Sequence, residues 1–175
     1  KQSLAIPLNM AITRDGKTLY LSAFGSRKIG IIDTATLESG AFVPSSDDHI
    51  ELGSGPVEGG GPTGLVLDEP GNRLYVMTRF DNSIVSIDLA QRVVVQRASL
   101  FNPEPKSLVA GRPFFYDARL TSSNGEAACA SCHVFGDMDD LAWDLGNPDG
   151  TQARNPNTRV PVDQNLELGA FHPMK

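Results

Sequence analysis

The feature that most constrains the fold of this chain is an internal repeat. Residues 7–36 align without gaps on residues 62–91, at an offset of 55 residues. Because a repeated segment tends to fold the same way twice, the first hundred residues are predicted to hold two copies of one small unit. The shared positions are turn glycines and apolar strand positions: Pro7 and Pro62, Gly16 and Gly71, Leu19 and Leu74, Tyr20 and Tyr75, Ile29 and Ile84, Ile32 and Ile87, Asp33 and Asp88, and Ala35 and Ala90.

Each copy has the pattern of a three-stranded antiparallel meander. In the first copy, the turns RDGK and GSRK separate the short apolar strands NMAIT, TLYLSA and IGIID. In the second copy, EPGN and FDNS separate GLVLD, RLYVMT and IVSID. Glycine, asparagine and proline in these turns suit the backbone angles of tight turns. A fourth strand is predicted after each copy, at residues 37–44 and at residues 92–100.

Units of about 40 residues with four short strands are typical of the blades of a β-propeller. We therefore predict two propeller-type blades, at residues 5–44 and residues 60–100, separated by a surface loop at residues 45–61 that is rich in Gly, Ser and acidic residues. The repeats also resemble those of the YVTN family of β-propellers, which carry similar DG, LYV and VID segments. The alternative is a small self-contained antiparallel sandwich.

Two blades leave an unpaired strand edge at each end, because a closed propeller has about four to eight blades. The chain also starts without methionine, in the middle of an alternating apolar pattern, and ends without a closing element. We therefore expect a fragment of a longer protein, truncated at its C-terminus. The expected partners of the strand edges are the remaining propeller blades or a second copy of the chain.

The strand pattern stops at residues 101–107, where two prolines and a lysine interrupt it. We place a domain boundary there, which gives a propeller-like domain at residues 1–104 and a second domain at residues 105–175. In the second domain, Ser107 is predicted to cap a helix over residues 108–120, with Pro113 either kinking it or lying in its first turn. The fold class is therefore multi-domain, with an all-β antiparallel part followed by a small, mainly α part.

Charge and hydropathy argue against two classes of partner. The net charge is −6 and the sequence pI is about 5.0, and no basic stripe is present that would neutralise phosphates, so nucleic acid is not expected. No apolar run reaches the 18 or so residues of a membrane span, so no span is expected in this chain. The first residues do not resemble a signal peptide.

The segment EAACASCHVF, residues 126–135, holds both cysteines of the chain, Cys129 and Cys132, followed directly by His133. A zinc site would need a second pair of ligands, and His49 and His172 do not form one. A redox dithiol would need a βαβ context that is not visible, and an unrelated pair of thiols would match this spacing only by chance. The spacing instead indicates a c-type haem, with both thiols bonded to the haem and His133 as an axial ligand to its iron.

The wider segment AGRPFFYDARLTSSNGEAACASCHVFGDMDDLAWDLGNP, residues 110–148, resembles the cytochrome c domain of the dihaem peroxidase and MauG superfamily. Pro113 and Asp140 depart from the pattern of that superfamily. The resemblance implies one covalent haem c per chain, and a redox partner protein or a second haem domain. It also implies a distal methionine in a later loop, for which we take Met174, with His172 as the alternative.

Other residues are expected around the haem. Trp143, Phe114 and Phe135 are predicted to form the wall of the haem pocket. The acidic run GDMDD, residues 136–140, is a candidate calcium site, although a solvated turn is the usual interpretation of acidic residues near glycine.

Taken with the resemblance, these features predict a haem-binding electron-transfer module of an exported bacterial protein, in the periplasm or outside the cell, because c-type haem is attached outside the cytoplasm in such organisms. One alternative is a fragment of a dihaem peroxidase or MauG-like oxidoreductase. The other is a propeller interaction protein whose haem is sensory or structural.

Overall fold

The structure is a computed structural model, and it describes residues 2–55, 57–122, 125–133, 136, 153–154 and 167–168. The chain divides into two compact units, residues 1–131 and residues 132–175. The first unit contains the two four-stranded β-sheets and most of the helices, and it is described first.

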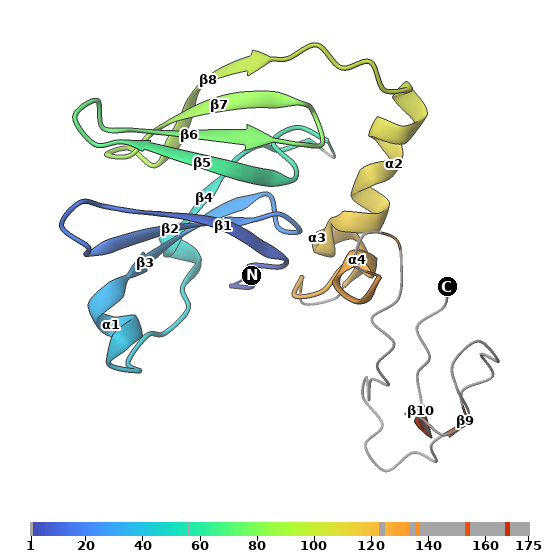
Figure 1. Cartoon of the computed structure of the whole chain (residues 1–175), viewed down its shortest axis with the longest axis horizontal. Helices are drawn as coiled ribbons and strands as arrows, with labels where there is room; N and C mark the ends of the chain where they lie inside the picture. The colour runs from blue at the N-terminus through green and yellow to red at the C-terminus, as the bar shows by residue number, and fades with distance from the viewer. Residues whose placement is uncertain are drawn as a thin grey trace. The chain divides into compact units, whose positions relative to one another are not determined.

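The first copy of the repeat folds into a four-stranded antiparallel sheet with the strand order β1-β2-β3-β4 (Figure 1). The short helix α1 (Thr34–Glu38) and a 3-10 turn, η1 (Ser46–Asp48), lie between the third and fourth strands. The strands are β1 (Pro7–Ile12), β2 (Thr18–Ala23), β3 (Lys28–Asp33) and β4 (His49–Glu51).

The second copy folds into a second sheet of the same kind, with the order β5-β6-β7-β8. The strands are β5 (Pro62–Asp68), β6 (Arg73–Thr78), β7 (Ser83–Asp88) and β8 (Val93–Ser99). The register follows the repeat, since Leu19 pairs with Ile32 in the first sheet and the equivalent Leu74 pairs with Ile87 in the second. The predicted antiparallel, mostly β character of this part of the chain is confirmed.

The predicted fourth strand is right in the second sheet and wrong in the first. Residues 37–44 form no strand, because Asp33 caps helix α1 by accepting a hydrogen bond from the Thr36 amide (2.8 Å), which turns the chain out of the sheet. The fourth strand is β4, inside the segment predicted as a surface loop. Ile50 in β4 and Leu52 directly after it are buried, each 1% exposed. Val43, in the segment predicted to form the strand, is 77% exposed.

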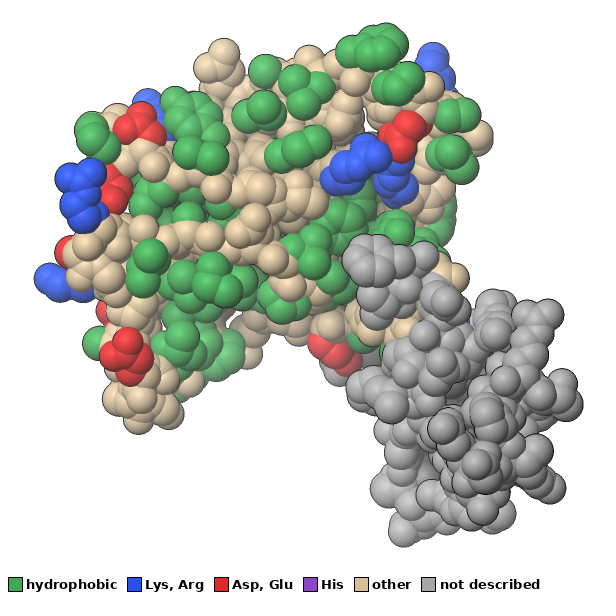
Figure 2. Space-filling model, viewed as in Figure 1, with side chains coloured by type: hydrophobic (Ala, Val, Ile, Leu, Met, Phe, Trp, Pro, Cys, Tyr) green, Lys and Arg blue, Asp and Glu red, His purple; other side chains and the backbone are tan. Residues whose placement is uncertain are grey.

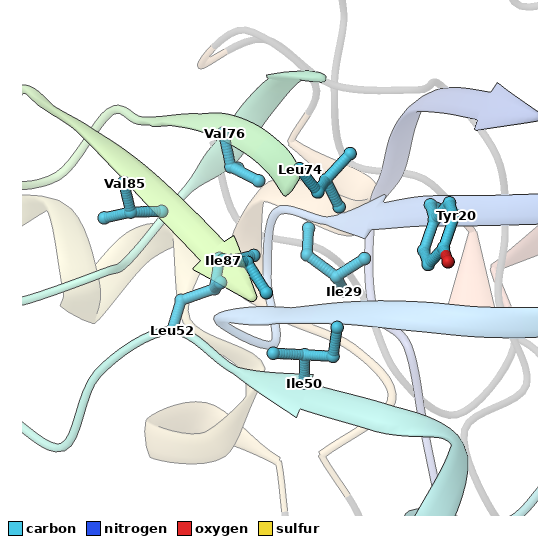
Figure 3. Close-up of a cluster of buried hydrophobic side chains, with 8 residues drawn as sticks. All are labelled: Tyr20, Ile29, Ile50, Leu52, Leu74, Val76, Val85 and Ile87. Carbon is cyan, nitrogen blue, oxygen red and sulfur yellow. The ribbon is translucent and has the colours of Figure 1, made fainter. Parts of the chain in front are cut away.

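The hydrophobic core lies between the two sheets (Figure 3). Burial of one such side chain stabilises the fold by about 1.5–3 kcal/mol, so this cluster joins the two sheets into one body. The first strands of the two sheets, β1 and β5, are also in contact. The first sheet contributes Tyr20, Ile29 and Ile50, the residue directly after β4 is Leu52, and the second sheet contributes Leu74, Val76, Val85 and Ile87.

Each sheet also has exposed apolar side chains away from this core. In the first sheet these include Met10 and Ile12 of β1, and in the second Tyr75 and Ile84. Figure 2 shows hydrophobic side chains over both sheets on the face it draws. We call the Met10 and Ile12 side the first outward face, and the Tyr75 and Ile84 side the second outward face.

Three helices follow the sheets: α2 (Lys106–Tyr116), α3 (Ala118–Thr121) and α4 (Cys129–Cys132). Ser107 does not cap α2 as predicted, because the helix starts at Lys106, two residues earlier than predicted, and its N-cap is Pro105, without a side-chain hydrogen bond. Pro113 lies inside α2, and the helix continues past it to Tyr116. The predicted alternative that places Pro113 in the first turn is therefore wrong, and the kink at Pro113 stays a prediction.

Aromatic contacts hold the end of α2 against the sheets. The Tyr116 ring meets the Phe24 ring edge-on at 5.3 Å, and Phe24 meets Phe80 in the same way at 5.4 Å. The compact unit therefore extends past residue 105, up to Ser131. The predicted boundary between two functional domains at residues 104 and 105 stays a prediction.

In the second unit, the described strands β9 (Ala153–Arg154) and β10 (Glu167–Leu168) pair in an antiparallel ladder. None of the helices in the described part of the chain is long and apolar enough to cross a membrane.

Candidate haem-attachment site

The two cysteines begin and end helix α4, which is a single turn from Cys129 to Cys132. Both carry thiols rather than a disulfide bond, and Cys129 is exposed while Cys132 is partly buried. Ser131 stabilises the start of the turn, since its Oγ accepts a hydrogen bond from the Ala128 amide (3.1 Å). After the turn, the Gly136 amide donates to the His133 carbonyl (3.0 Å), with Gly136 at a φ of 80° that suits glycine.

These residues fit a c-type haem on two counts. Residues three apart on a helix are neighbours, about 5–6 Å between their Cβ atoms, so the two thiols of α4 suit two bonds to one edge of a flat ring. His133 follows the second cysteine directly in the chain, as an axial ligand in this kind of site requires.

The segment that leads to Cys129 is held against the first sheet. Ala118 at the start of α3 packs with Ala128 and with Ala5, which precedes β1. The Ala118 amide also donates to the Gly25 carbonyl (2.8 Å) in the turn between β2 and β3. The residue before Cys129 is therefore fixed to the β-sheet part of the molecule.

A buried ion pair stabilises the same junction. The Arg27 guanidinium, 2% exposed, contacts the Asp117 carboxylate, 0% exposed. Asp117 also caps α3 by accepting a hydrogen bond from the Arg119 amide (2.9 Å), and Arg27 donates to the Gly55 carbonyl. Burial lowers the pKa of Arg27 from its ordinary value, and the neighbouring Asp117 charge opposes that shift.

A cavity of about 230 Å³ is lined mostly by polar and charged side chains, among them Ser26 and Lys28, the two chain neighbours of Arg27. The buried Lys28 ammonium lies 3.5 Å from Glu51 Oε1, and Arg119 Nη1 lies 3.7 Å from Glu51 Oε2. Lys28 Nζ is also 3.4 Å from His49 Nδ1, and burial, followed by the Lys28 charge, lowers the pKa of His49. The lining residues are Ser3, Ser26, Lys28, Glu51, Arg119 and Gly125.

The predicted pocket residues are not all brought together. Phe114 lies on α2 with 70% of its surface exposed, and its carbonyl oxygen is 4.0 Å from Cys129 Sγ. Its role in a pocket wall stays a prediction. Phe135, Trp143, Met174, the alternative ligand His172 and the candidate calcium residues 137–140 lie outside the described residues.

Arg27, Asp117 and Arg119 were not predicted as site residues. Asp117 could have been found as a helix cap, because it directly precedes the short helical segment ARLT. Its pairing with Arg27 leaves no local signal, since the two residues meet only through the tertiary fold.

Neither a protein-family model nor a curated protein sequence matches the chain. Among solved structures, it is similar to hydrazine synthase of Kuenenia stuttgartiensis (TM-score 0.45, 18% identity, 58% of this chain and 25% of that one). It is also similar to a putative 6-phosphogluconolactonase of Bacteroides fragilis (0.42, 16%, 55% and 28%) and to a periplasmic gluconolactonase of Pseudomonas aeruginosa (0.43, 25%, 57% and 28%). The chain thus spans about a quarter of the length of these proteins, and we draw no conclusion about activity from them.

Proposed function

We propose that this chain is the haem-binding electron-transfer module of an exported bacterial protein. Cys129 and Cys132 would hold a haem c through two thioether bonds, and His133 would be one axial ligand. The observation that carries the proposal is that both cysteines of the chain are thiols on the same helical turn, directly before a histidine. A haem bound in this way supplies one-electron transfer between Fe(III) and Fe(II).

The residues around α4 support this role in two ways. Cys129 is exposed, so its thiol is accessible for attachment. Ala118 and Ala128 fix the preceding segment to the first sheet, so one end of the attachment turn is held in place before a haem is added.

The second axial ligand and the pocket wall are part of the same proposal. Met174 would be the second ligand, with His172 as the alternative, and Trp143, Phe114 and Phe135 would line the pocket. Calcium at residues 136–140 is a secondary proposal. Because thioether attachment takes place outside the cytoplasm in bacteria, the proposed location is the periplasm or the cell surface.

For the β-sheet part, we propose two blades of a YVTN-like propeller whose outward faces are covered by further sheets of the same repeat. The repeat supports this arrangement. Tyr75 and Ile84 on the second outward face are equivalent to Tyr20 and Ile29, which lie in the core between the sheets. Met10 and Ile12 on the first outward face are equivalent to Leu65 and Leu67, which pack against that core.

Each outward face is therefore equivalent to one side of the interface between the two sheets. A further sheet of the same kind, from a longer chain or from a second copy, could pack on it in the same way. The haem would exchange electrons with a redox partner protein or with a second haem domain.

The test is to produce the intact chain by export in a bacterium that attaches c-type haem. We expect the mass of one haem per chain, retained after denaturation, and a low-spin spectrum in both redox states. The double variant C129S/C132S should carry no covalent haem while retaining the same far-UV circular dichroism. A wild-type chain without covalent haem would show that the proposal is wrong, and rapid peroxide turnover would indicate the peroxidase-like alternative.

A further inference from the structure

The Arg119 guanidinium is poorly satisfied for a cation that is only 29% exposed. Its Nε is buried without a hydrogen-bond partner among the described residues. Its ion-pair contacts are 3.5 Å to Asp117 Oδ1 and 3.7 Å to Glu51 Oε2, longer than the roughly 2.7–2.9 Å of a charge-assisted hydrogen bond. A guanidinium has a planar fork of N–H donors that matches a carboxylate, so this group has the capacity to bind one.

Arg119 shares its cavity with a second cation, the buried Lys28. At about 230 Å³, the cavity exceeds the roughly 30 Å³ that one water occupies in the liquid, which leaves room for a small organic group. The cluster formed by Arg27, Lys28 and Arg119 faces the two carboxylates of Asp117 and Glu51. It therefore carries one more positive charge than negative charge.

Glu51 shows which chemistry the two cations attract. Its carboxylate stands between them, 3.5 Å from Lys28 Nζ and 3.7 Å from Arg119 Nη1, and the side chain is largely exposed. These are ion-pair separations in which the carboxylate does not fill the fork of Arg119. A ligand carboxylate that approaches Arg119 more closely would replace this contact, and Glu51 can swing out into solvent.

We propose that Arg119 and Lys28 form a carboxylate-binding subsite in this cavity, with Glu51 as its internal competitor. Arg119 provides the two parallel donors, and Lys28 provides a second positive charge on the buried side. The two possible sources of the carboxylate are a small free acid and a propionate of the haem. The second source rests on the function proposed above.

The position of the subsite relative to Cys129 makes the haem source reachable. Ala118, the residue before Arg119, and Ala128, the residue before Cys129, belong to one small buried cluster. Consecutive Cα atoms are 3.8 Å apart, so the backbone of Arg119 and that of Cys129 each lie one residue away from a member of this cluster. A haem bonded at Cys129 would therefore be attached in the same region of the fold as the backbone of Arg119.

The first arm of the test uses the haem-free full chain, C129S/C132S, titrated with sodium acetate while the Arg Nε–H signals are followed by NMR. We expect one arginine signal to shift and saturate. The added substitution Arg119→Gln should weaken acetate binding about ten-fold or more, as expected for loss of a charged hydrogen bond, and Glu51→Gln should strengthen it several-fold. Arg73→Gln is the control, since Arg73 has similar exposure and a 2.7 Å hydrogen bond to Asp88.

The second arm uses the haem-loaded chain. The propionate bands in its resonance Raman spectrum, and the pH dependence of its reduction potential, should change in Arg119→Gln and stay the same in Arg73→Gln. A change in this arm, with acetate binding lost on haem loading, identifies the propionate as the source. Acetate binding that persists in the loaded chain identifies a free acid.

Failure of the two proposals can be distinguished. If the wild-type chain carries no haem, the proposed function is wrong, and the acetate arm still decides the subsite. If acetate shifts no arginine signal in the haem-free chain, and Arg119→Gln leaves the propionate bands unchanged in a loaded one, the subsite proposal is overturned.

Discussion

The Arg27 guanidinium and the Asp117 carboxylate meet in a buried ion pair that joins the turn between β2 and β3 to the first residue before α3. Both side chains are withdrawn from water. Arg27 also has a φ of 55°, in the left-handed region that few residues other than glycine adopt. The side chain is therefore held at a tight turn, where it fastens the segment leading to the cysteines to the first sheet.

Removal of one partner of this pair should be strongly destabilising. Asp117→Ala leaves a buried guanidinium without its counter-ion and removes the cap of α3, for an expected loss of about 3–5 kcal/mol in the free energy of unfolding. The double variant Arg27→Met/Asp117→Ala should lose less than the sum of the two single changes. Urea unfolding followed by circular dichroism provides the measurement.

The exposed pair of Lys17 and Asp15 at 3.8 Å is the matched control. Lys17→Ala should change the free energy of unfolding by about 0–1 kcal/mol. A loss in Asp117→Ala as small as that would contradict the assignment of a buried, structurally important pair.

The unexpected strand β4 leads to a second prediction. Ile50 and Leu52 are fully buried between the sheets, so Ile50→Ala and Leu52→Ala should each lower the free energy of unfolding by about 2–5 kcal/mol. Val43→Ala, in the segment that was predicted to be the strand, should change it by less than about 0.5 kcal/mol. Equal effects at Val43 and Ile50 would favour the original strand assignment.

The strand β4 and the strand predicted at residues 37–44 show how far the sequence predicts the fold. The first three strands of each sheet have several alternating apolar residues and clear turns, so local pattern alone predicts them. Asp33 and Asp88 behave alike, as each accepts a backbone hydrogen bond three residues on, from Thr36 and from Gln91. After that point the copies diverge, and Ile50 and Leu52 are too few and too close to glycines to indicate a strand.

The sequence also predicts only some residues of the candidate site. Cys129, Cys132 and His133 are contiguous, so their spacing indicates the chemistry before any fold is known. Arg27 and Asp117 are brought together by the packing of α3 on the β2–β3 turn, which depends on the hydrogen bond between Ala118 and Gly25. No local pattern encodes that contact.

The stability should depend on pH through Glu104. Hydrogen bonds from Arg79 and then from Arg112 lower the pKa of Glu104 from 4.5 to about 2. Because the folded state has the lower pKa, this stabilisation is complete above pH 4.5 and is lost as the pH falls toward 2. We therefore expect the free energies of unfolding of wild type and Glu104→Gln, measured with denaturant at pH 6, 4 and 2.5, to become more similar as the pH falls.

The control for this pH series is Glu38→Gln on the exposed α1, where no ion pair is found among the described residues. The free-energy difference between Glu104→Gln and wild type should change more over this pH range than the difference for this control. If the two differences change alike, the two arginines do not stabilise the charged form of Glu104.

The two outward faces predict a specific pattern of self-association. Because the first and second outward faces repeat opposite sides of one interface, they should bind each other head to tail rather than each binding its own copy. Met10→Lys would block only the first outward face and Tyr75→Lys only the second.

In sedimentation experiments at increasing concentration, wild type should associate further while each variant alone stays monomeric. A mixture of the two variants should form a dimer that does not grow, since each molecule retains one competent face. If the mixture stays monomeric while wild type associates, the faces are not complementary in this sense, and a self-complementary contact would leave one variant able to dimerise alone.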